Sequence, residues 1–382
     1  MKTIGLIAEY NPFHTGHLYQ ITKIKEMYPE SLIILITNSS FTQRGDISII
    51  NKTDKTDIAL ENNIDLIIEL PFIYATQSAD IFAYGAIKIL NYLKIDTIVF
   101  GSETNNIQKL TELANTQINN KEYDKIVKKY IATGINYPTA LNKALIDING
   151  NNITEPNDLL GLSYIKEIIK NNYNITPISI KRIGSYHEKE ISNKYANATL
   201  IRKELLKNNN VNKYIPKNEK KLLINNLSLE NYFNYLKYKI ISTTDLTIYQ
   251  TVDEGIENRI KKEITNAKSW EDLVLKIKTK RYTYNKINRM LIHILTSLTK
   301  EEVKKSEIDY IRILGFNERG QKYLNKIKKE IKLPLIYNYK PNISLLLDIE
   351  LRATTIYNMA LPKEKQINEY KLKPTIKNKY TK

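Results

Sequence analysis

The first half of the chain alternates short apolar runs with longer segments in which apolar residues recur every three or four positions. The short runs are rich in β-branched residues and almost continuously apolar, as in parallel strands that are buried on both faces. This order predicts an α/β fold, with a Rossmann-like, doubly wound parallel sheet covered by helices. The runs predict strands at 3–10, 31–39, 65–70, 96–103 and 177–184, and the segments between them predict helices at 17–27, 54–62, 77–94 and 158–171.

The alternation stops in the second half. Long stretches rich in Leu, Ile, Lys and Asn predict helices, and the segment "LLKNNNVNKYIP" has the composition of a connector. The sequence therefore predicts two domains, a sheet domain over 1–207 and a mainly helical, basic domain over 208–382. The predicted helical stretches are 218–248, 253–265, 270–298, 300–331 and a last helix near 345–358.

The net charge of +17 belongs to the second half of the chain. Residues 1–200 carry 20 Lys and Arg against 21 Asp and Glu, whereas residues 201–382 carry 38 against 20. Lysines on solvated faces are one interpretation of this excess. A polyanionic partner such as nucleic acid explains it better. A membrane surface is the weaker alternative, because no basic amphipathic helix with Trp or Phe anchors stands out.

The composition excludes several classes of chemistry. The chain has no Cys, which excludes disulfides, thiolate catalysis and Cys-ligated zinc. No apolar run reaches the ~20 residues that span a bilayer, and the first residues lack a signal-peptide pattern. We therefore expect a cytoplasmic protein without a membrane partner, and no obligate protein partner is evident.

The segment "GLIAEYNPFHTGH", residues 5–17, holds two of the four histidines of the chain. It passes from a predicted strand into a predicted helix, whose first N–H groups are unpaired and carry a partial positive charge. Gly16 leaves room for a nucleotide against the backbone, and His14 and His17 emerge on one side of the first turn, where both can donate to phosphate oxygens. We expect them to stabilise the charge that develops as a nucleotide phosphate is attacked and pyrophosphate leaves.

Two other interpretations of the histidine pair stay open at this point. The pair could bind a metal ion, but no third imidazole and no Cys lie nearby in sequence. It could also only cap the helix. Phosphate handling is favoured because unusual residue clusters follow each predicted strand, at the edge where open parallel sheets bind ligands. These clusters are 10–17, 38–46, 71–72, 101–103 and 182–187.

The motif H-x-G-H after a first strand resembles the signature of the HIGH-motif nucleotidyltransferases, and "ANATLIRKELL" (196–206) resembles their second element. The flanking segments resemble the tRNA(Met) cytidine acetate ligase family, in order from residue 3 to about 360. The segments are "FTQRGD" (41–46), "LIIELPFIYATQSADIFAYGAI" (66–87), "VFGSE" (99–103), "PNDLLGLSYIK" (156–166) and "KRYTYNKINRMLIHIL" (280–295).

The resemblance implies an ATP-dependent ligase. Such an enzyme forms acetyl-adenylate from acetate and ATP, with Mg²⁺ offsetting charge on the pyrophosphate. It then transfers the acetyl group to N4 of the wobble cytidine of elongator tRNA(Met). The sheet domain would bind ATP and the basic half would bind tRNA.

The resemblance also implies the site residues, with His14 and His17 as the catalytic pair. Gly101 would clear the adenine, Asn157 would meet a base or ribose edge, and Arg182 would meet phosphate in a bidentate way. Thr199 and Arg202 would touch the pyrophosphate end. The implied ATP-binding residues are Ile7, Ala8, Glu9, Tyr10, Asn11, Pro12, Phe13, His14, Thr15, Gly16, His17, Leu18, Tyr19, Gln20, Gly101, Asn157 and Arg182.

Further positions are candidates for RNA contact or for structural roles. Arg44 could hold phosphate or the incoming RNA, while Gln77 and Ser78 are expected to cap a helix. A face with cations and an aromatic ring could grip phosphates while Tyr282 or Tyr284 stacks on a base; its members are Lys280, Arg281, Tyr282, Lys286 and Arg289. Asn197 and the run Asn38-Ser39-Ser40 depart from the family pattern.

Two other functions compete with this hypothesis. An adenylyltransferase acting on a small phosphorylated substrate would keep the nucleotide in its product, but it has no need of a second half with a net charge of +18. An RNA-binding protein with a vestigial nucleotide fold would not need His14, Gly16, His17 and Arg182. No carboxylate in the opening motif is an obvious general base, and none is needed because acetate arrives ionised.

Overall fold

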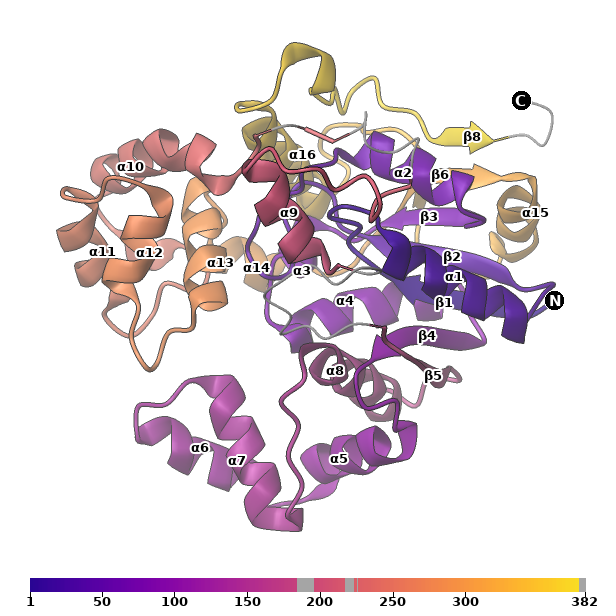
Figure 1. Ribbon diagram of the computed structural model, residues 1–382, viewed down its shortest axis with the longest axis horizontal. Helices are drawn as coiled ribbons and strands as arrows, with labels where there is room; N and C mark the ends of the chain where they lie inside the picture. Colours follow the sequence, from indigo (N-terminus) through magenta and orange to yellow (C-terminus); the bar gives the residue numbers. More distant parts are fainter. Residues whose placement is uncertain (184–195, 217–222, 225, 378–382) are drawn as a thin grey trace.

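The computed structural model describes residues 1–183, 196–216, 223–224 and 226–377 (Figure 1). Over these residues one mixed sheet of eight strands runs in the order β5-β4-β1-β2-β3-β6-β7, with β8 beside β6. The strands are β1 (Thr3–Ile7), β2 (Leu32–Thr37), β3 (Leu66–Glu69), β4 (Thr97–Ser102), β5 (Thr176–Lys181), β6 (Ile311–Asn317), β7 (Leu335–Ile336) and β8 (Thr375–Lys377).

The five strands of the first half are parallel, and β1 lies at their centre with β2 on one side and β4 on the other. The expected α/β fold is confirmed, with all five strands and the four helices at their predicted places. The chain first builds β1, β2 and β3 in one direction and then crosses to β4 and β5. The carboxyl ends of β1 and β4 therefore flank the point where the strand order reverses, which is where such sheets bind ligands.

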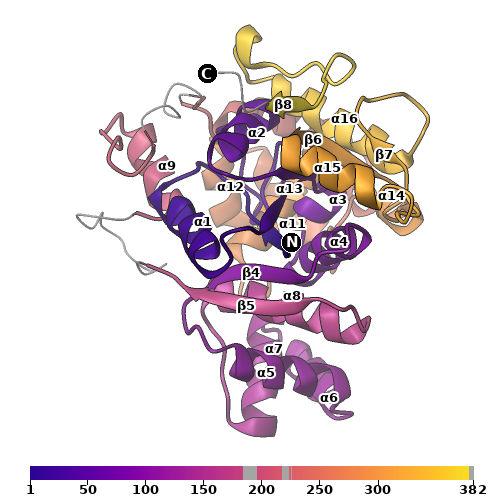
Figure 2. The ribbon, with the colours of Figure 1, turned by 90° about the vertical axis from the view of Figure 1, so that its right-hand side faces the viewer.

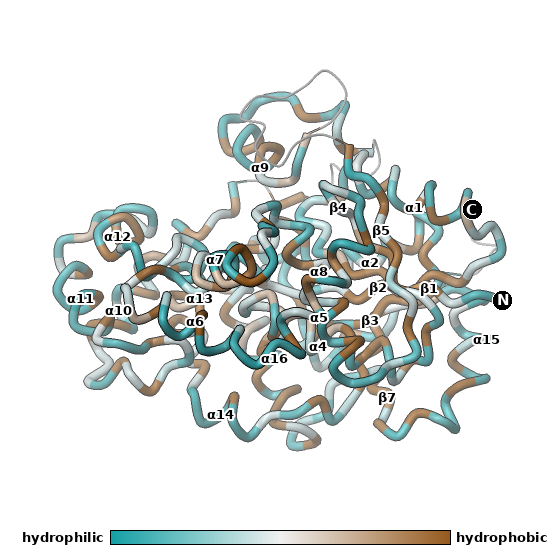
Figure 3. Tube along the Cα trace, turned by 90° about the horizontal axis from the view of Figure 1, so that it is seen from below, coloured by the Kyte–Doolittle hydropathy of each residue, from teal (hydrophilic) through white to brown (hydrophobic). Residues whose placement is uncertain are grey.

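The strands alternate between two buried layers because successive side chains point to opposite faces. On β2, Ile33 and Leu35 pack into one core, whereas Leu32, Ile34 and Ile36 pack into the other. Both faces are thus covered, as the continuous apolar runs predicted. In Figure 3 the tube of the central strands is mostly brown, whereas brown and teal alternate along α11 and α12.

The helices surround the sheet and extend beyond it (Figures 1 and 2). Helices α5 to α7, which the pattern did not predict, form a group below β4, β5 and α8. The helices are α1 (Thr15–Met27), α2 (Lys52–Glu61), α3 (Phe72–Ala75), α4 (Ala79–Tyr92), α5 (Ile107–Asn119), α6 (Tyr123–Ala132), α7 (Tyr137–Asn149), α8 (Pro156–Lys170), α9 (Ala198–Leu206), α10 (Phe233–Ser242), α11 (Ile256–Ile264), α12 (Trp270–Ile277), α13 (Tyr284–Leu295), α14 (Lys300–Lys305), α15 (Glu318–Ile327) and α16 (Leu345–Asn358), with short 3₁₀ turns at Leu229–Tyr232, Leu246–Ile248 and Lys363–Lys365.

The second half is mainly helical, as expected, but it also returns to the sheet. The pattern predicted helix over 300–331, and that is wrong at its centre, where β6 pairs antiparallel with β3. The larger core continues from the sheet into α10–α13, through Phe41, which contacts the rings of Tyr232 and Tyr357. The division of the chain at residue 207 stays a prediction, and both the sheet and this core cross it.

Among the described residues, no helix is both long and apolar enough to cross a membrane. Residues 184–187 of the predicted cluster 182–187 lie outside the described residues.

Candidate active site

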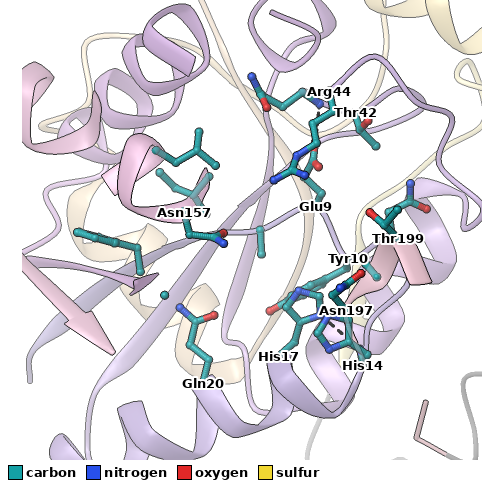
Figure 4. Close-up of a pocket in the computed structure, with 18 of the residues that line it drawn as sticks. Glu9, Tyr10, His14, His17, Gln20, Thr42, Arg44, Asn157, Asn197 and Thr199 are labelled. Atoms are coloured by element: carbon teal, nitrogen blue, oxygen red, sulfur yellow. Dashed lines mark hydrogen bonds between the residues drawn. The ribbon is translucent and has the colours of Figure 1, made fainter. Parts of the chain in front are cut away.

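A cavity of about 190 Å³ opens at the carboxyl ends of β1 and β4, at the point where the strand order reverses (Figure 4). Its walls come from the β1–α1 turn, the loop after β2, α4, the ends of β4 and β5 with α8, and the start of α9. Figure 4 shows His14 and His17 on one side of this cavity and Arg44 and Glu9 on the opposite side. Four of the five predicted clusters therefore contribute to one cavity, namely 10–17, 38–46, 101–103 and, through Arg182, 182–187. The cluster 71–72 does not line it, because Phe72 is buried in the core.

The two histidines cap helix α1 with one ring nitrogen each. The N–H of Gly16 donates to Nδ1 of His14 at 3.0 Å, and the N–H of His14 donates to Nδ1 of His17 at 3.3 Å. The rings stack with their centroids 3.9 Å apart. The capping interpretation is thus correct, but it uses only Nδ1. A neutral ring whose Nδ1 accepts must carry its proton on Nε2, so each ring keeps one further donor.

Burial keeps both imidazoles neutral. It lowers the pKa of His14 to about 3, with help from the positive charge of Arg182, and it lowers the pKa of His17 well below the ordinary value. Both residues line the cavity. Before any ligand binds, the pair offers hydrogen bonds rather than positive charge, and the positive field comes from the helix terminus and the arginines.

We expect ¹⁵N NMR of the histidine rings to show His14 and His17 as neutral Nε2–H tautomers throughout pH 5–8. Below pH 6.5 the unfolded chain would bind protons that these two folded rings do not, so their contribution to stability is lost as the pH falls. Spectra of the His14→Asn and His17→Asn variants would assign the signals. A ring that titrates near pH 6.5 in the folded protein would contradict this expectation.

The turn before α1 accepts few other residues. A Cβ at position 16 would lie 2.8 Å from Cε1 of His14, so only glycine lets that ring fold over the helix start. Tyr10 has a φ of 47°, a left-handed conformation that its packing against Phe13 and His17 stabilises, with ring centroids 4.8 Å away in both cases. Gly16 therefore shapes the pair and does not itself line the cavity.

Arg182 directly follows β5, and its side chain extends over the carboxyl end of the neighbouring strand β4. Its Nη1 donates to Oδ1 of Asn157 at 3.4 Å, and its Nε lies 3.9 Å from Oε1 of Glu103 and is buried without a hydrogen bond. A Cβ at Gly101 would lie 3.1 Å from Cγ of Arg182. The absence of a side chain at Gly101 thus leaves room for the side chain of Arg182. Its expected role beside the adenine stays a prediction.

The loop after β2 and helix α9 form the wall beyond the histidines. Arg202 donates through Nη1 to the carbonyl of Asn11 and through Nη2 to Asp46, both at 2.7 Å. The side chain of Asn11 donates to the carbonyl of Ile47 and accepts from the N–H of Ile49, each at 2.8 Å. Asn11 therefore positions the loop with its side chain.

The departure at position 197 keeps the function of a cap. Asn197 precedes α9, and its side chain accepts from the N–H of Leu200 at 2.9 Å. Asparagine is among the best N-cap residues, so α9 begins cleanly with Thr199 in its first turn, at the cavity. The cavity thus faces the N-termini of two helices, α1 and α9, which together favour an anion.

Most of the predicted ATP-binding residues line this cavity, and the others do not. Phe13 is fully buried, while Leu18 is 38% exposed on the outer face of α1. Pro12, Phe13, Thr15, Gly16, Leu18 and Tyr19 are absent from the lining. The predicted residues in the lining are Ile7, Ala8, Glu9, Tyr10, Asn11, His14, His17, Gln20, Gly101, Asn157 and Arg182, together with Arg44, Thr199 and Arg202.

An interaction between the buried side chains of Glu9, at the cavity, and Lys55, on α2, was not predicted from the sequence. Burial raises the pKa of Glu9, whose Oε1 accepts from the N–H of Gln43 at 2.6 Å. Lys55 faces it from α2, and burial lowers the pKa of this lysine to about 7 although Glu9 opposes that shift. The ammonium donates to the carbonyl and the side-chain oxygen of Asn38, both at 3.0 Å. The departure at 38–40 is therefore a buried polar turn that holds Lys55.

The apolar wall of the cavity was also missed. Phe82, Phe100, Leu160 and Tyr164 form it, from α4, β4 and α8. Their positions follow the ordinary period of core residues, so only the fold could distinguish them.

The predicted RNA-contact residues lie along the start of α13 and just before it. Tyr282 is only 4% exposed, and its hydroxyl donates to the carbonyl of Asp253 at 2.7 Å. Its ring therefore cannot stack on a base, whereas Tyr284 is 37% exposed. Lys286 lies 4.4 Å from the ring centroid of Tyr282, and Arg281 lies 3.5 Å from Glu254.

Arg289 points inward to the loop that holds Arg44. Its Nη1 donates to the carbonyl of Gln43 at 3.2 Å, and burial lowers its pKa to about 10. Gly45, at a φ of 76°, packs so closely that a Cβ would lie 2.4 Å from the backbone nitrogen of Arg289. Arg289 is thus a positioning residue, and Lys280, which is exposed, remains a candidate for RNA contact.

Of the two expected caps, Ser78 occupies the N-cap position of α4 but makes no side-chain capping hydrogen bond, and Gln77 precedes it. The carbonyl of Gln77 accepts from Nε2 of Gln43 at 2.8 Å. This bond ties the loop after β2 to the start of α4. Within the described parts of the chain, no three His, Asp or Glu side chains gather into a group that could hold a metal ion.

Two imidazole donors lie at a helix start, on the crevice edge of a parallel sheet. This arrangement is that of a nucleotidyltransferase of the HIGH class. The family model described as "HIGH Nucleotidyl Transferase" matches residues 1–371. The chain is 38% identical over 387 residues to tRNA(Met) cytidine acetate ligase of Caldicellulosiruptor saccharolyticus, which covers 97% of this chain and 96% of that protein. It is 39% identical over 355 residues to the enzyme of the same name from Geobacillus sp. (strain WCH70), covering 88% of each.

Two solved structures agree with this match. Thermotoga maritima TmcAL in its apo form superposes with a TM-score of 0.91 at 29% identity, over 99% of this chain and 100% of that chain. The same protein bound with alpha-thio ATP gives a TM-score of 0.88 with the same identity and coverage. The chain belongs to the family of tRNA(Met) cytidine acetate ligases, and the expected resemblance is confirmed.

Proposed function

We propose that this chain is an ATP-dependent ligase that joins acetate to a tRNA. It forms acetyl-adenylate from acetate and ATP with release of pyrophosphate, and then transfers the acetyl group to N4 of the wobble cytidine of elongator tRNA(Met). A tRNA substrate places the reaction in the cytoplasm. The observation that carries the proposal is the cavity at the switch point, where two Nε2–H donors and two helix N-termini converge.

The first step needs little covalent chemistry from the protein. An oxygen of acetate attacks the α-phosphorus, and the bond from that phosphorus to the pyrophosphate oxygen breaks. Acetate arrives ionised, so no base is required. The barrier falls because His14 and His17 donate to oxygens on which charge develops, while Arg182 and the starts of α1 and α9 stabilise the negative charge of the phosphates.

Magnesium fits this site only as an ion bound to the phosphates of ATP. The described residues hold no cluster of three ligands, and Glu103 is engaged by the N–H groups of Asn157 and Asp158, at 3.2 Å and 3.1 Å. Mg²⁺ binds readily through phosphate oxygens and water. We therefore propose that it enters with the triphosphate, and we assign no step to it.

The second step needs an RNA beside this cavity. The positive charge of residues 201–382, with 38 Lys and Arg against 20 Asp and Glu, supports RNA binding. An anticodon loop is single-stranded, so its base can leave the stack at low cost and reach an activated acid. The name of the relatives supports tRNA(Met) as the substrate.

The test is to incubate the protein with ATP, labelled acetate and bulk tRNA, and to map the label by nuclease digestion. We expect acetate-dependent ATP–pyrophosphate exchange, AMP as a product, and the label on a single cytidine of one tRNA. A stable product that retains the adenylyl group would favour the adenylyltransferase alternative. Absence of exchange with intact ATP binding would reject the ligase.

A further inference from the structure

A second and larger cavity, of about 640 Å³, adjoins the nucleotide cavity. It is bounded by α9, by the loop after β2, by the segment before α10, and by the starts of α12 and α13. Its volume lies in the range of sites that enclose small organic molecules. Figure 1 shows that α9 and α13 lie between the sheet and the outer helices α10 to α12, so this cavity is located where the two halves of the chain meet.

The two cavities share one wall. Arg44, Thr199 and Arg202 line both of them. Arg202 is held in that wall by Asn11 and Asp46, as described above, and its side chain is 17% exposed. A group bound in the second cavity therefore lies directly beside the nucleotide cavity, at the wall that Arg44, Thr199 and Arg202 form.

The second cavity contains a tyrosine whose ring is fixed in place. The hydroxyl of Tyr284 donates to a carboxylate oxygen of Glu271, and the ring is 37% exposed. Behind it, Nε1 of the buried Trp270 donates to Oδ1 of Asn288 at 2.9 Å. An aromatic ring that is anchored at its hydroxyl loses little entropy when a flat ligand stacks on it.

The acidic side chains of this cavity are already engaged within the protein. Glu230 accepts from the N–H groups of Trp270 and Glu271, at 2.8 Å and 3.0 Å, and so caps α12. The carboxylate of Glu271 holds Tyr284, and that of Asp46 holds Arg202. Arg44 of the shared wall and the exposed Lys203 offer positive charge where a nucleic-acid backbone would pass. Arg202 is paired with Asp46.

We propose that this second cavity receives the base of the acceptor nucleotide, a pyrimidine splayed out of a single-stranded RNA loop, with Tyr284 as its stacking ring. This proposal rests on the proposed function. The exocyclic amine nitrogen attacks the acetyl carbonyl carbon across the shared wall. The C–N bond forms, the bond from the carbonyl carbon to the phosphate oxygen breaks, AMP leaves, and the proton of the amine passes to water.

The test compares Tyr284→Ala and Tyr284→Phe with Tyr238→Ala. Tyr238 is a matched control because it is 75% exposed on α10 and does not line the cavity. Base–aromatic stacking of about 1–3 kcal/mol corresponds to roughly 5- to 150-fold. We expect Tyr284→Ala to lower kcat/KM for acetyl transfer to tRNA by this factor, while acetate-dependent ATP–pyrophosphate exchange stays within twofold of wild type. Tyr284→Phe and Tyr238→Ala should transfer within a few-fold of wild type.

A second measurement separates stacking from a structural role of Tyr284. Trp270 is the only Trp of the chain and lines this cavity, so its fluorescence reports binding of an anticodon stem-loop. A stem-loop that is abasic at the target position should bind wild type more weakly than the intact stem-loop. In Tyr284→Ala this difference should largely disappear, because the base has lost its partner.

The results of these measurements decide between the second cavity as the base site and other locations. Normal transfer by Tyr284→Ala, or an unchanged intact-to-abasic difference, overturns the proposal. If Tyr284→Ala fails to fold, Leu206→Trp replaces it; Leu206 is 48% exposed on α9, and a larger side chain there narrows the cavity. Unimpaired transfer by that variant also overturns the proposal. Absence of exchange or transfer in the wild type would instead reject the proposed function itself.

Discussion

Replacement of His14 or His17 by asparagine should lower acetate-dependent ATP–pyrophosphate exchange by about 10²- to 10³-fold, the usual cost of removing one donor to a developing oxyanion. Asparagine places its Oδ1 where the imidazole places Nδ1, and it has no atom in the place of Nε2. The variant therefore keeps the acceptor that caps α1 and loses the donor that faces the cavity. Because asparagine is itself a favoured cap, we expect the melting temperature to change by no more than about 3 °C.

The matching glutamine variants keep the donor and lose the acceptor. Glutamine carries an amide nitrogen close to the place of Nε2, and it lacks the acceptor at the place of Nδ1. His17→Gln should therefore lose less activity than His17→Asn and more stability, because the bond from the N–H of His14 is broken. Measuring exchange and melting temperature for both pairs separates catalysis from capping. Near-normal exchange in His14→Asn and His17→Asn would show that the histidines only cap the helix.

The order of elements in the first half was predictable because its information is local. Parallel strands buried on both faces give apolar runs, and helices with their own apolar period separate these runs along the chain. The turn at 10–17 could be interpreted for the same reason, since a strand, a glycine and a helix start lie within one short segment. The helices α5 to α7 were missed because this region was left without a prediction of its own.

Strand β6 was missed because its partners are remote in sequence. Arg312 stands in the middle of its apolar run and gives it the appearance of a helix with one polar face. In the structure Arg312 is 1% exposed and donates to Glu369 at 2.9 Å, 57 positions along the chain. No local pattern contains such a pair. The burial of Lys52 and Lys55 could not be predicted locally either, because lysine is normally exposed and both are buried here.

The candidate site shows the same division between local and remote information. Its histidines lie in one short strand–helix segment and could be interpreted locally, whereas Gly101, Asn157 and Arg182 were implied by the family resemblance. The interaction of Glu9 with Lys55 joins two elements and was not predicted. The choice between Tyr282 and Tyr284 depended on which side of α13 is covered. The hydroxyl of Tyr282 reaches the carbonyl of Asp253 in another loop, a contact that no periodicity reveals.

Lys52→Met should lower the free energy of unfolding by about 3–5 kcal/mol, because it leaves buried carboxylates without their partner. The ammonium of Lys52 contacts Glu69 and Glu369 and lies 3.6 Å from Oε1 of Glu350, and these side chains are at most 1% exposed. Burial alone would lower the pKa of Lys52, but the three carboxylates outweigh it and raise that pKa. Arg312 is the only other cation among the described residues of this cluster, through Glu369.

This cluster joins the end of the chain to the base of the candidate site. Lys52 begins α2, Glu69 ends β3, Glu350 lies on α16, and Glu369 follows it, so four distant segments meet at one ammonium group. Lys55 lies one turn further along α2 and faces Glu9. We therefore expect Lys52→Met to weaken ATP binding as well, measured by titration calorimetry at a temperature where the variant is still folded.

Glu350→Gln is the matched control for Lys52→Met. Burial and the charge of Glu69 raise the pKa of Glu350 to about 7, so between pH 4.5 and pH 7 the folded state binds a proton that the unfolded chain has released. Its contribution to stability is therefore present at low pH and is lost as the pH rises through 7.

Glutamine can still accept from the N–H of Phe72, a bond of 2.7 Å in the native protein, and it carries no charge. Urea unfolding at pH 5, 7 and 8.5 should show that Glu350→Gln gains stability relative to wild type as the pH rises, whereas Lys52→Met is destabilised at all three values. A Lys52→Met variant as stable as wild type would show that the carboxylates share protons and need no cation.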